Sequence, residues 1–147
     1  MAEGRIEAVC VSAEKHVQKQ AVDRVVLVPD KGIEGDAHYG FGHRQVSLLA
    51  DESVDKMREK GVKDLKPGAF GENLLTRGID LLSLQIGDRL RVGDMVVLEV
   101  SQVGKECVDR CAIYYAAGDC IMPREGIFAR VIEGGAVVPG DAVRKEG

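Results

Sequence analysis

The sequence predicts a single domain over residues 1–147 that is mainly β, with a few short helices and strands that form a closed or partly open barrel. Glycine makes up 18 of the 147 residues, well above its typical share of about 7%. The apolar runs are short and rich in valine, isoleucine and leucine. Short strands at close spacing with tight turns are typical of barrels and sandwiches.

Five glycines precede an aspartate, and each pair is a turn signal because glycine reaches positive φ without steric cost and aspartate hydrogen-bonds to nearby backbone. The pairs are Gly35-Asp36, Gly87-Asp88, Gly93-Asp94, Gly118-Asp119 and Gly140-Asp141. So many turns argue against a helix bundle, a coiled coil, a fibrous chain and a disordered chain. The second, third and fifth pairs are predicted to be turns between barrel strands.

The N-terminal third is predicted to hold three strands and one polar loop. Residues 6–11 and 22–28 are rich in valine and isoleucine, and Pro29 ends the second run. A glycine-rich loop follows over 30–43, and residues 45–50 form a short buried strand.

The most clearly predicted helix spans residues 51–60. Asp51 is expected to cap its N-terminus, Val54 and Met57 share one face, and Gly61 is expected to stop it.

The rest of the chain is predicted to alternate between β structure and short helices. Residues 67–73 form a second glycine-rich loop. The most β-like runs follow it at 81–86, 89–92 and 95–102, and β structure returns at 137–144. Helices are predicted at 111–117 and 124–133.

The charge balance excludes several partners. Twenty basic and 24 acidic residues give a net charge of −4, with no block of either sign, so we expect no nucleic-acid binding. No apolar stretch approaches the roughly 20 residues of a membrane span. The N-terminus has no basic segment followed by an apolar one, so we expect no signal peptide and a cytoplasmic location with reduced thiols.

Cys107 is the sharpest chemical feature. It follows a predicted strand and lies between Lys105 and Arg110. Such cations stabilise a thiolate and lower its pKa from about 8.5, and a thiolate can attack sulfur or bind a soft metal. An idle thiol is the alternative at this stage, whereas Cys10, in an apolar strand, is interpreted as a small core residue.

A zinc site is a weaker alternative. Cys107 and Cys111 have a spacing that zinc sites tolerate, and Cys120 is a third candidate ligand. A structural zinc site uses four ligands, and the fourth would be a distant histidine.

Both glycine-rich loops are candidate ligand-binding segments. The first ends in His43 and Arg44, which add donors and charge, and backbone amides in such turns can hold anions. The second presents Glu72 and Asn73 to a ligand or is only a turn. Neither loop has the pattern of a P-loop or a dinucleotide fingerprint.

The ordered motifs resemble those of the MOSC domain, the family named for the C-terminal domain of molybdenum cofactor sulfurases. They are Gly-Ile-Glu-Gly-Asp-Ala-His (32–38), Arg-Gln-Val-Ser-Leu-Leu (44–49), Pro-Gly-Ala-Phe-Gly-Glu-Asn (67–73), Ile-Gly-Asp (86–88), Leu-Glu-Val-Ser-Gln (98–102) and Gly-Lys-Glu-Cys (104–107). The segment 118–131 resembles the small stand-alone bacterial members. The resemblance covers essentially the whole chain.

The resemblance implies a β-barrel with a functional cysteine at Cys107. In the family this thiol is proposed to carry sulfur from a pyridoxal-phosphate cysteine desulfurase, or to ligate molybdenum in a pterin cofactor (molybdopterin). Implied partners are the desulfurase and molybdopterin-pathway proteins or molybdoenzymes. The implied cofactor-binding set is His38, His43, Arg44, Asn73, Lys105, Arg110 and Arg124.

Two alternatives accompany this implied role. One is a molybdenum-dependent reductase of N-hydroxylated compounds that needs an external electron donor, and the other is a non-catalytic module that binds a pterin or another anion. The chain also departs from the stand-alone pattern at Val108, where relatives often have a histidine that could help to deprotonate the thiol.

Overall fold

The computed structural model describes residues 3–15, 17–40, 42, 44–63, 65–104, 121 and 125–146. Within them the strands are β1 (Glu3–Val11), β2 (Gln20–Val22), β3 (Val25–Val28), β4 (Gly32–Ile33), β5 (Val46–Ala50), β6 (Leu74–Arg77), β7 (Arg89–Val92), β8 (Val96–Val103), β9 (Ile127–Glu133), β10 (Gly135–Val137) and β11 (Ala142–Glu146). The same residues hold an α-helix, α1 (Asp51–Glu59), and a 3-10 helix, η1 (Leu81–Ser83). The predicted mainly β class is confirmed.

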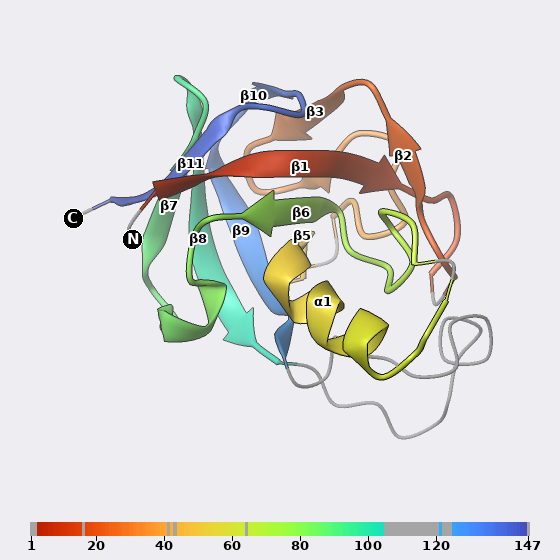
Figure 1. Ribbon diagram of the computed structural model, residues 1–147. Helices are drawn as coiled ribbons and strands as arrows, with labels where there is room; N and C mark the ends of the chain where they lie inside the picture. The colour runs from red at the N-terminus through yellow and green to blue at the C-terminus, as the bar shows by residue number, and fades with distance from the viewer. Residues whose placement is uncertain are drawn as a thin grey trace.

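Seven strands form a closed barrel, as the sequence predicted. Going round the wall, β1 is followed by β11, β7, β8, β9, β5 and β6, and β6 pairs with β1 again (Figure 1). Closure depends on the pairing of Gly4 in β1 with Val143 in β11. The neighbours are antiparallel except β5 and β6, which α1 connects in the way that parallel strands require.

The alternation of the barrel strands produces two apolar layers. Side chains such as Leu48, Leu98 and Val143 fill the barrel interior. The opposite faces of β1, β5, β6 and β9 carry a second cluster, which includes Leu49 and Phe128 and packs under α1. Strand side chains point alternately to the two faces, so β9 contributes to both layers.

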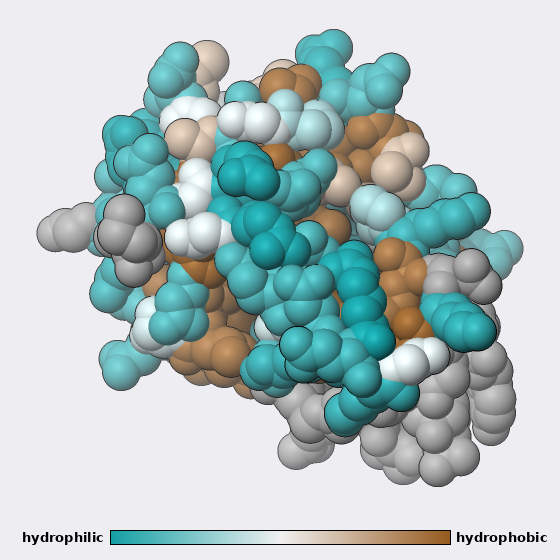
Figure 2. Space-filling model, viewed as in Figure 1, coloured by the Kyte–Doolittle hydropathy of each residue, from teal (hydrophilic) through white to brown (hydrophobic). Residues whose placement is uncertain are grey.

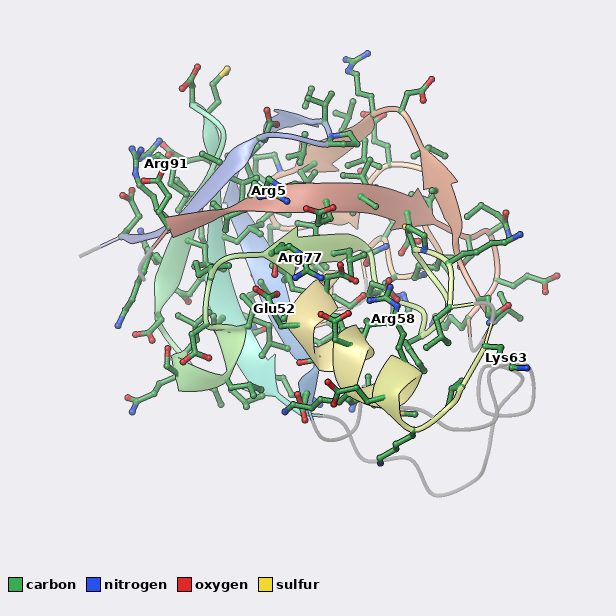
Figure 3. The ribbon with its side chains drawn as sticks, in the orientation of Figure 1. Arg5, Glu52, Arg58, Lys63, Arg77 and Arg91 are labelled. Carbon is green, nitrogen blue, oxygen red and sulfur yellow. The ribbon has the colours of Figure 1, made fainter. Side chains whose placement is uncertain are left out.

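Charged side chains tie α1 to the outside of the barrel. Arg77 of β6 pairs with Asp51 and Asp55 of α1, and Arg58 pairs with the same two carboxylates. Figure 3 shows Arg77 and Arg58 pointing into this region from the two elements. On the face seen in Figure 2, hydrophilic side chains cover the middle of the molecule, and a hydrophobic area lies near η1.

The predicted helix over 124–133 is wrong, because residues 127–133 are β9. In β9, Ile127 and Val131 point into the barrel and Phe128 points to the cluster under α1. A strand buried on both faces has apolar residues at helical spacing as well. The predicted helix over 111–117 lies outside the described residues.

Three other expectations are corrected. The run 81–86 is not a strand: η1 begins there because the Asp80 side chain accepts a hydrogen bond from the Leu82 amide. The run 22–28 is divided between β2, which pairs with β1, and β3, which belongs to a separate small sheet. Strand β6 was not predicted.

The helix at 51–60 is confirmed in position but not in its cap. Ala50 occupies the N-cap position without a side-chain hydrogen bond, and Asp51 is the first helical residue. Gly61 follows the helix with φ of +87°, as expected for a C-terminal stop.

Of the predicted turns between barrel strands, Gly93-Asp94 joins β7 to β8 as expected, whereas Gly140-Asp141 lies between β10 of the small sheet and β11 of the barrel. Gly87-Asp88 instead precedes β7 after η1. Within the described residues, no helix is both long and apolar enough to cross a membrane.

Candidate functional site

Arg44 is held at the outer wall of the barrel, immediately before β5. Its Nε donates a hydrogen bond to Oε1 of Gln102 at 3.0 Å. Its guanidinium lies over the ring of Phe128, 5.6 Å from the ring centroid, a distance typical of a cation–π contact. Within the described residues the two terminal amino groups of Arg44 have no hydrogen-bond partner. The side chain is therefore held at Nε, and its two terminal amino groups are not engaged by any residue that the structure describes.

Gln102 connects this arginine to the end of β8. Its Nε2 donates to the carbonyl of Gly104 at 2.8 Å. The register of β8 against β9 shifts between Val100 and Gln102, as at a β-bulge, and bulges commonly re-aim a side chain.

The residue after β8 and the residue before β9 lie side by side. The Gly104 amide donates to the Gly126 carbonyl at 2.8 Å. Lys56 and Ser53 of α1 both bind the Glu125 carboxylate. Five predicted site residues, His43, Lys105, Cys107, Arg110 and Arg124, lie outside the described residues.

Asn73 is fully buried and joins three strands. Its Nδ2 donates to the carbonyl of Cys10 in β1, and its Oδ1 accepts from the amide and hydroxyl of Ser47 in β5. The Asn73 amide donates to the Ser47 hydroxyl and carbonyl. The described contacts of Asn73 are therefore those of a structural residue at the start of β6.

His38 belongs to a buried cluster of charged groups at the end of β1. Its amide donates to Oδ2 of Asp36, and its Nδ1 lies 3.4 Å from the same atom. The other oxygen of Asp36 accepts from Lys19 Nζ at 2.9 Å and from the Ser12 amide. Burial acts to raise the pKa of Asp36, but the hydrogen bonds from His38 and Lys19 outweigh it and hold that pKa well below its usual range.

The second glycine-rich loop turns its acid inward. Glu72 is buried, and its carboxylate accepts hydrogen bonds from the amides of Gly68 and Phe70. Burial raises the pKa of Glu72 to about 7, although these backbone hydrogen bonds act to lower it. Of the two interpretations from the sequence, a loop that presents Glu72 and Asn73 to a ligand or only a turn, the described contacts fit the turn.

Cys10 is a core residue, as the sequence predicted. It is 0% exposed and packs in the cluster under α1. Burial, followed by the nearby Glu72 charge, raises the pKa of its thiol to about 12, and Lys19 opposes the rise. A thiol with so high a pKa is a poor nucleophile at neutral pH.

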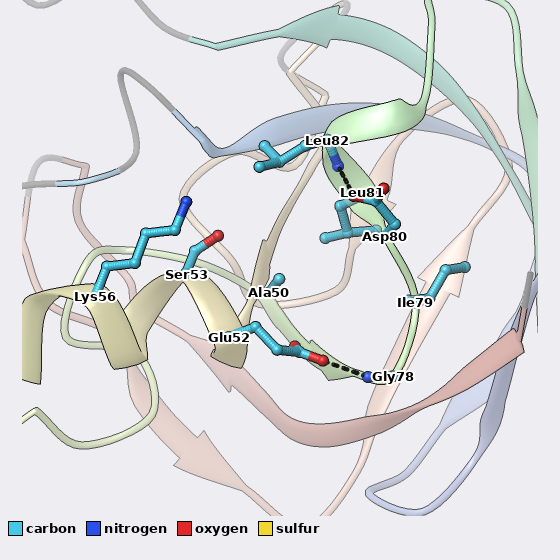
Figure 4. Close-up of a pocket in the computed structure, with 9 residues that line it drawn as sticks. All are labelled: Ala50, Glu52, Ser53, Lys56, Gly78, Ile79, Asp80, Leu81 and Leu82. Atoms are coloured by element: carbon cyan, nitrogen blue, oxygen red, sulfur yellow. Dashed lines mark hydrogen bonds between the residues drawn. The ribbon is translucent and has the colours of Figure 1, made fainter. Parts of the chain in front are cut away.

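Two pockets lie away from Arg44. One, of about 330 Å³, lies between α1 and the segment 78–82 (Figure 4). The other, of about 290 Å³, is lined by the 18–21 segment and by residues of the second glycine-rich loop. Neither is lined by His38, Arg44 or Asn73.

Sequence reasoning missed Gln102, Lys19 and Asp36 as individual residues. Gln102 and Asp36 lie in the family motifs 98–102 and 32–38, and membership of a motif was the indication that they could serve the site. Lys19 stands in a polar stretch with no motif, and nothing in the sequence distinguishes it.

A family model for the MOSC domain matches residues 34–144. The chain belongs to the MOSC domain family. This match includes Arg44, Gln102 of β8 and Phe128 of β9, and also the Cys107 segment between these two strands.

The MOSC chain is 30% identical over 115 residues to a protein of Gibberella moniliformis named "Reductase". The alignment covers 71% of the chain and 20% of that protein. The chain therefore spans about a fifth of the length of this curated relative.

Solved structures share the fold. The YuaD protein from Bacillus subtilis aligns with a TM-score of 0.82 at 21% identity, over 97% of this chain and 95% of its own. YiiM from Geobacillus stearothermophilus aligns at 0.73 and 19% identity, over 98% of this chain and 75% of its own. YiiM from Escherichia coli aligns at 0.66 and 22% identity, over 97% and 70%.

Proposed function

We propose that this MOSC chain is a sulfur carrier or cofactor-binding protein of molybdenum-cofactor metabolism, with the thiolate of Cys107 as its working group. The family is associated with the molybdenum cofactor. The observation that carries the proposal is the Arg44 guanidinium fixed at the end of β8. Cys107 follows Gly104 by three residues, a stretch that spans at most about 11 Å when extended.

Arg44 supports the binding of an anionic group. A guanidinium held at Nε presents its two terminal amino groups as a planar fork, which matches the oxygens of a phosphate. A pterin cofactor with a phosphate fits this chemistry, and when bound it supplies a metal that soft thiolate ligands favour. The proposed binding set is His38, His43, Arg44, Lys105, Arg110 and Arg124. Asn73, the other residue that the resemblance implied, supports the strands through its contacts with Cys10 and Ser47.

The sulfur-carrier step needs no added oxidant. The Cys107 thiolate attacks the outer sulfur of a persulfide on a cysteine desulfurase. The new S–S bond forms on Cys107 as the old S–S bond breaks, and the desulfurase cysteine leaves as a thiolate that takes up a proton.

Mass spectrometry tests this step. Incubation with a cysteine desulfurase and cysteine should add one sulfur atom to the chain. Cys107→Ser should lose the added mass, and Cys120→Ser is the matched control that should keep it. An identical gain in Cys107→Ser would contradict the carrier role.

The Gibberella relative is named "Reductase", which favours a reductase as the second candidate. The family resemblance adds the chemistry, which is molybdenum-dependent reduction of N-hydroxylated compounds with an external electron donor. Metal analysis of protein from a molybdenum-replete host separates the two. Stoichiometric molybdenum that is lost in Cys107→Ser favours the reductase. Anion binding that survives removal of every thiol favours a non-catalytic module.

A further inference from the structure

The side chain of Gln102, near the end of β8, hydrogen-bonds both to Arg44 and to Gly104, the residue that follows this strand. Oε1 accepts from Arg44 Nε at 3.0 Å, and Nε2 donates to the Gly104 carbonyl at 2.8 Å. A single carboxamide thus connects the cation before β5 with the point at which the chain continues toward Cys107.

Only one orientation of the carboxamide is compatible with both contacts. The arginine Nε can only donate, so it must face the amide oxygen, and the Gly104 carbonyl can only accept, so it must face the amide nitrogen. Glutamate has no donor for Gly104, and leucine has neither group. The position therefore requires an amide of this length.

The Gln102 contact also restrains the arginine from a second side. The Arg44 Cζ lies over the Phe128 ring, 5.6 Å from its centroid, and the hydrogen bond at Nε fixes the position of the side chain along the ring. Arginine otherwise has many rotamers, and ordering such a side chain when a ligand binds costs affinity. In this arrangement the ordering is already present before an anion arrives.

We infer that Gln102 is a positioning residue that holds the Arg44 fork against the end of β8, so that an anion meets an ordered arginine beside the point from which the chain continues toward Cys107. This inference rests on the proposed function, because it assigns Arg44 the role of attracting an anion near Cys107. Gln102 acts through Arg44 and does not itself contact the ligand.

Thiol alkylation with two reagents tests the inference. Iodoacetate is an anion and iodoacetamide is neutral, and both react with the thiolate. The measured quantity is the rate constant with iodoacetate divided by the rate constant with iodoacetamide. The thiolate fraction affects both rate constants equally, so this ratio reports the positive charge near the thiol. The chain used carries Cys111→Ser and Cys120→Ser, while the buried Cys10 stays in place.

We expect Gln102→Leu to lower the ratio roughly two- to tenfold, the cost of leaving one long side chain unordered. Gln102→Asn keeps the carboxamide on a shorter side chain, so it tests whether the amide must reach both Arg44 and Gly104. It is also a milder variant if the leucine variant folds poorly. Gln85→Leu, at an exposed position before β7, is the matched control and should leave the ratio unchanged.

A double-mutant cycle with Arg44→Met separates positioning from a general structural effect. In the Arg44→Met background, Gln102→Leu should have no further effect on the ratio. An equal loss in both backgrounds, or no loss with Arg44 present, would overturn the inference. Alkylation needs neither desulfurase nor molybdenum, so failure of this test and failure of the persulfide test are separate results.

Discussion

At the scale of single residues, the chain buries a charged pair and provides both of its members with specific partners. Lys19 and Asp36 form an ion pair with side chains that are 2% and 0% exposed. Such pairs stabilise a fold only when their remaining hydrogen-bonding capacity is used. Here Ser12 supplies an amide to Asp36 and a hydroxyl to Lys19. The cluster therefore fixes the first glycine-rich loop against the end of β1.

The raised pKa of Glu72 predicts that the stability of the fold depends on pH. Its pKa is raised from 4.5 to about 7, so between these values the folded chain keeps a proton that the unfolded chain has lost. The free energy of unfolding should therefore fall as the pH rises from about 4.5 to about 7, by on the order of 2–3 kcal/mol. Urea denaturation at several pH values measures it.

Glu72→Gln should remove this part of the pH dependence. The variant should also be less stable throughout, because an amide oxygen cannot replace both acceptors of the carboxylate. Glu34→Gln, at an exposed position, is the control and should keep the native slope. A glutamine variant with the same slope as the native chain would show that another group titrates.

At the scale of elements, the loop 67–73 depends on a close contact between Gly68 and Lys19. The Lys19 amide donates to the Gly68 carbonyl. A Cβ at Gly68 would lie 2.2 Å from the Lys19 carbonyl oxygen, where φ is +88°. The loop and the β1–β2 connection are therefore packed backbone to backbone.

Gly68→Ala should destabilise the fold by clearly more than Gly40→Ala. Both residues have positive φ, but a Cβ at Gly40 meets nothing within 4 Å, so that variant should show only conformational strain of about 1 kcal/mol. The clash at Gly68 should add about 2 kcal/mol or more, within the range of overpacked sites. Thermal denaturation compares the two, and equal losses would argue against the close contact.

Local sequence signals predicted most elements but not how they are paired. The helix at 51–60 and the β structure at 89–92 and 95–102 follow from periodicity and turn residues, which act over a few positions. Strand β9 was taken for a helix because the barrel interior buries one of its faces and the cluster under α1 buries the other, and neither layer is visible in the run itself. Of the candidate site, Arg44 was named in advance, whereas Gln102 and Phe128 became partners only through strand register.

At the scale of the whole molecule, the barrel depends on pairing between the two ends of the chain. Val143 of β11 faces Gly4 of β1 and Val92 of β7, and it is 0% exposed. A Cβ at Gly4 would lie 2.4 Å from the Arg77 carbonyl oxygen, so the wall is tight at the closure.

Val143→Ala should lower the free energy of unfolding by about 2 kcal/mol, the cost of deleting buried methyl groups from a core that relaxes only in part. Val138→Ala, at a position 37% exposed, should change it by less than about 0.5 kcal/mol. Urea midpoints of the two variants measure the difference. Similar losses would indicate that the closure contributes no more than a surface turn.

The sequence by itself determined the β class, the turns, the core role of Cys10 and the order of motifs that mark the MOSC family. Each of these is encoded over a few neighbouring residues. The tertiary structure alone decided that Asn73 and Glu72 face inward and that Gln102 meets Arg44, 58 positions away in the chain. Such contacts depend on strand register and barrel closure, because long-range pairing brings together residues whose local patterns carry no information about each other.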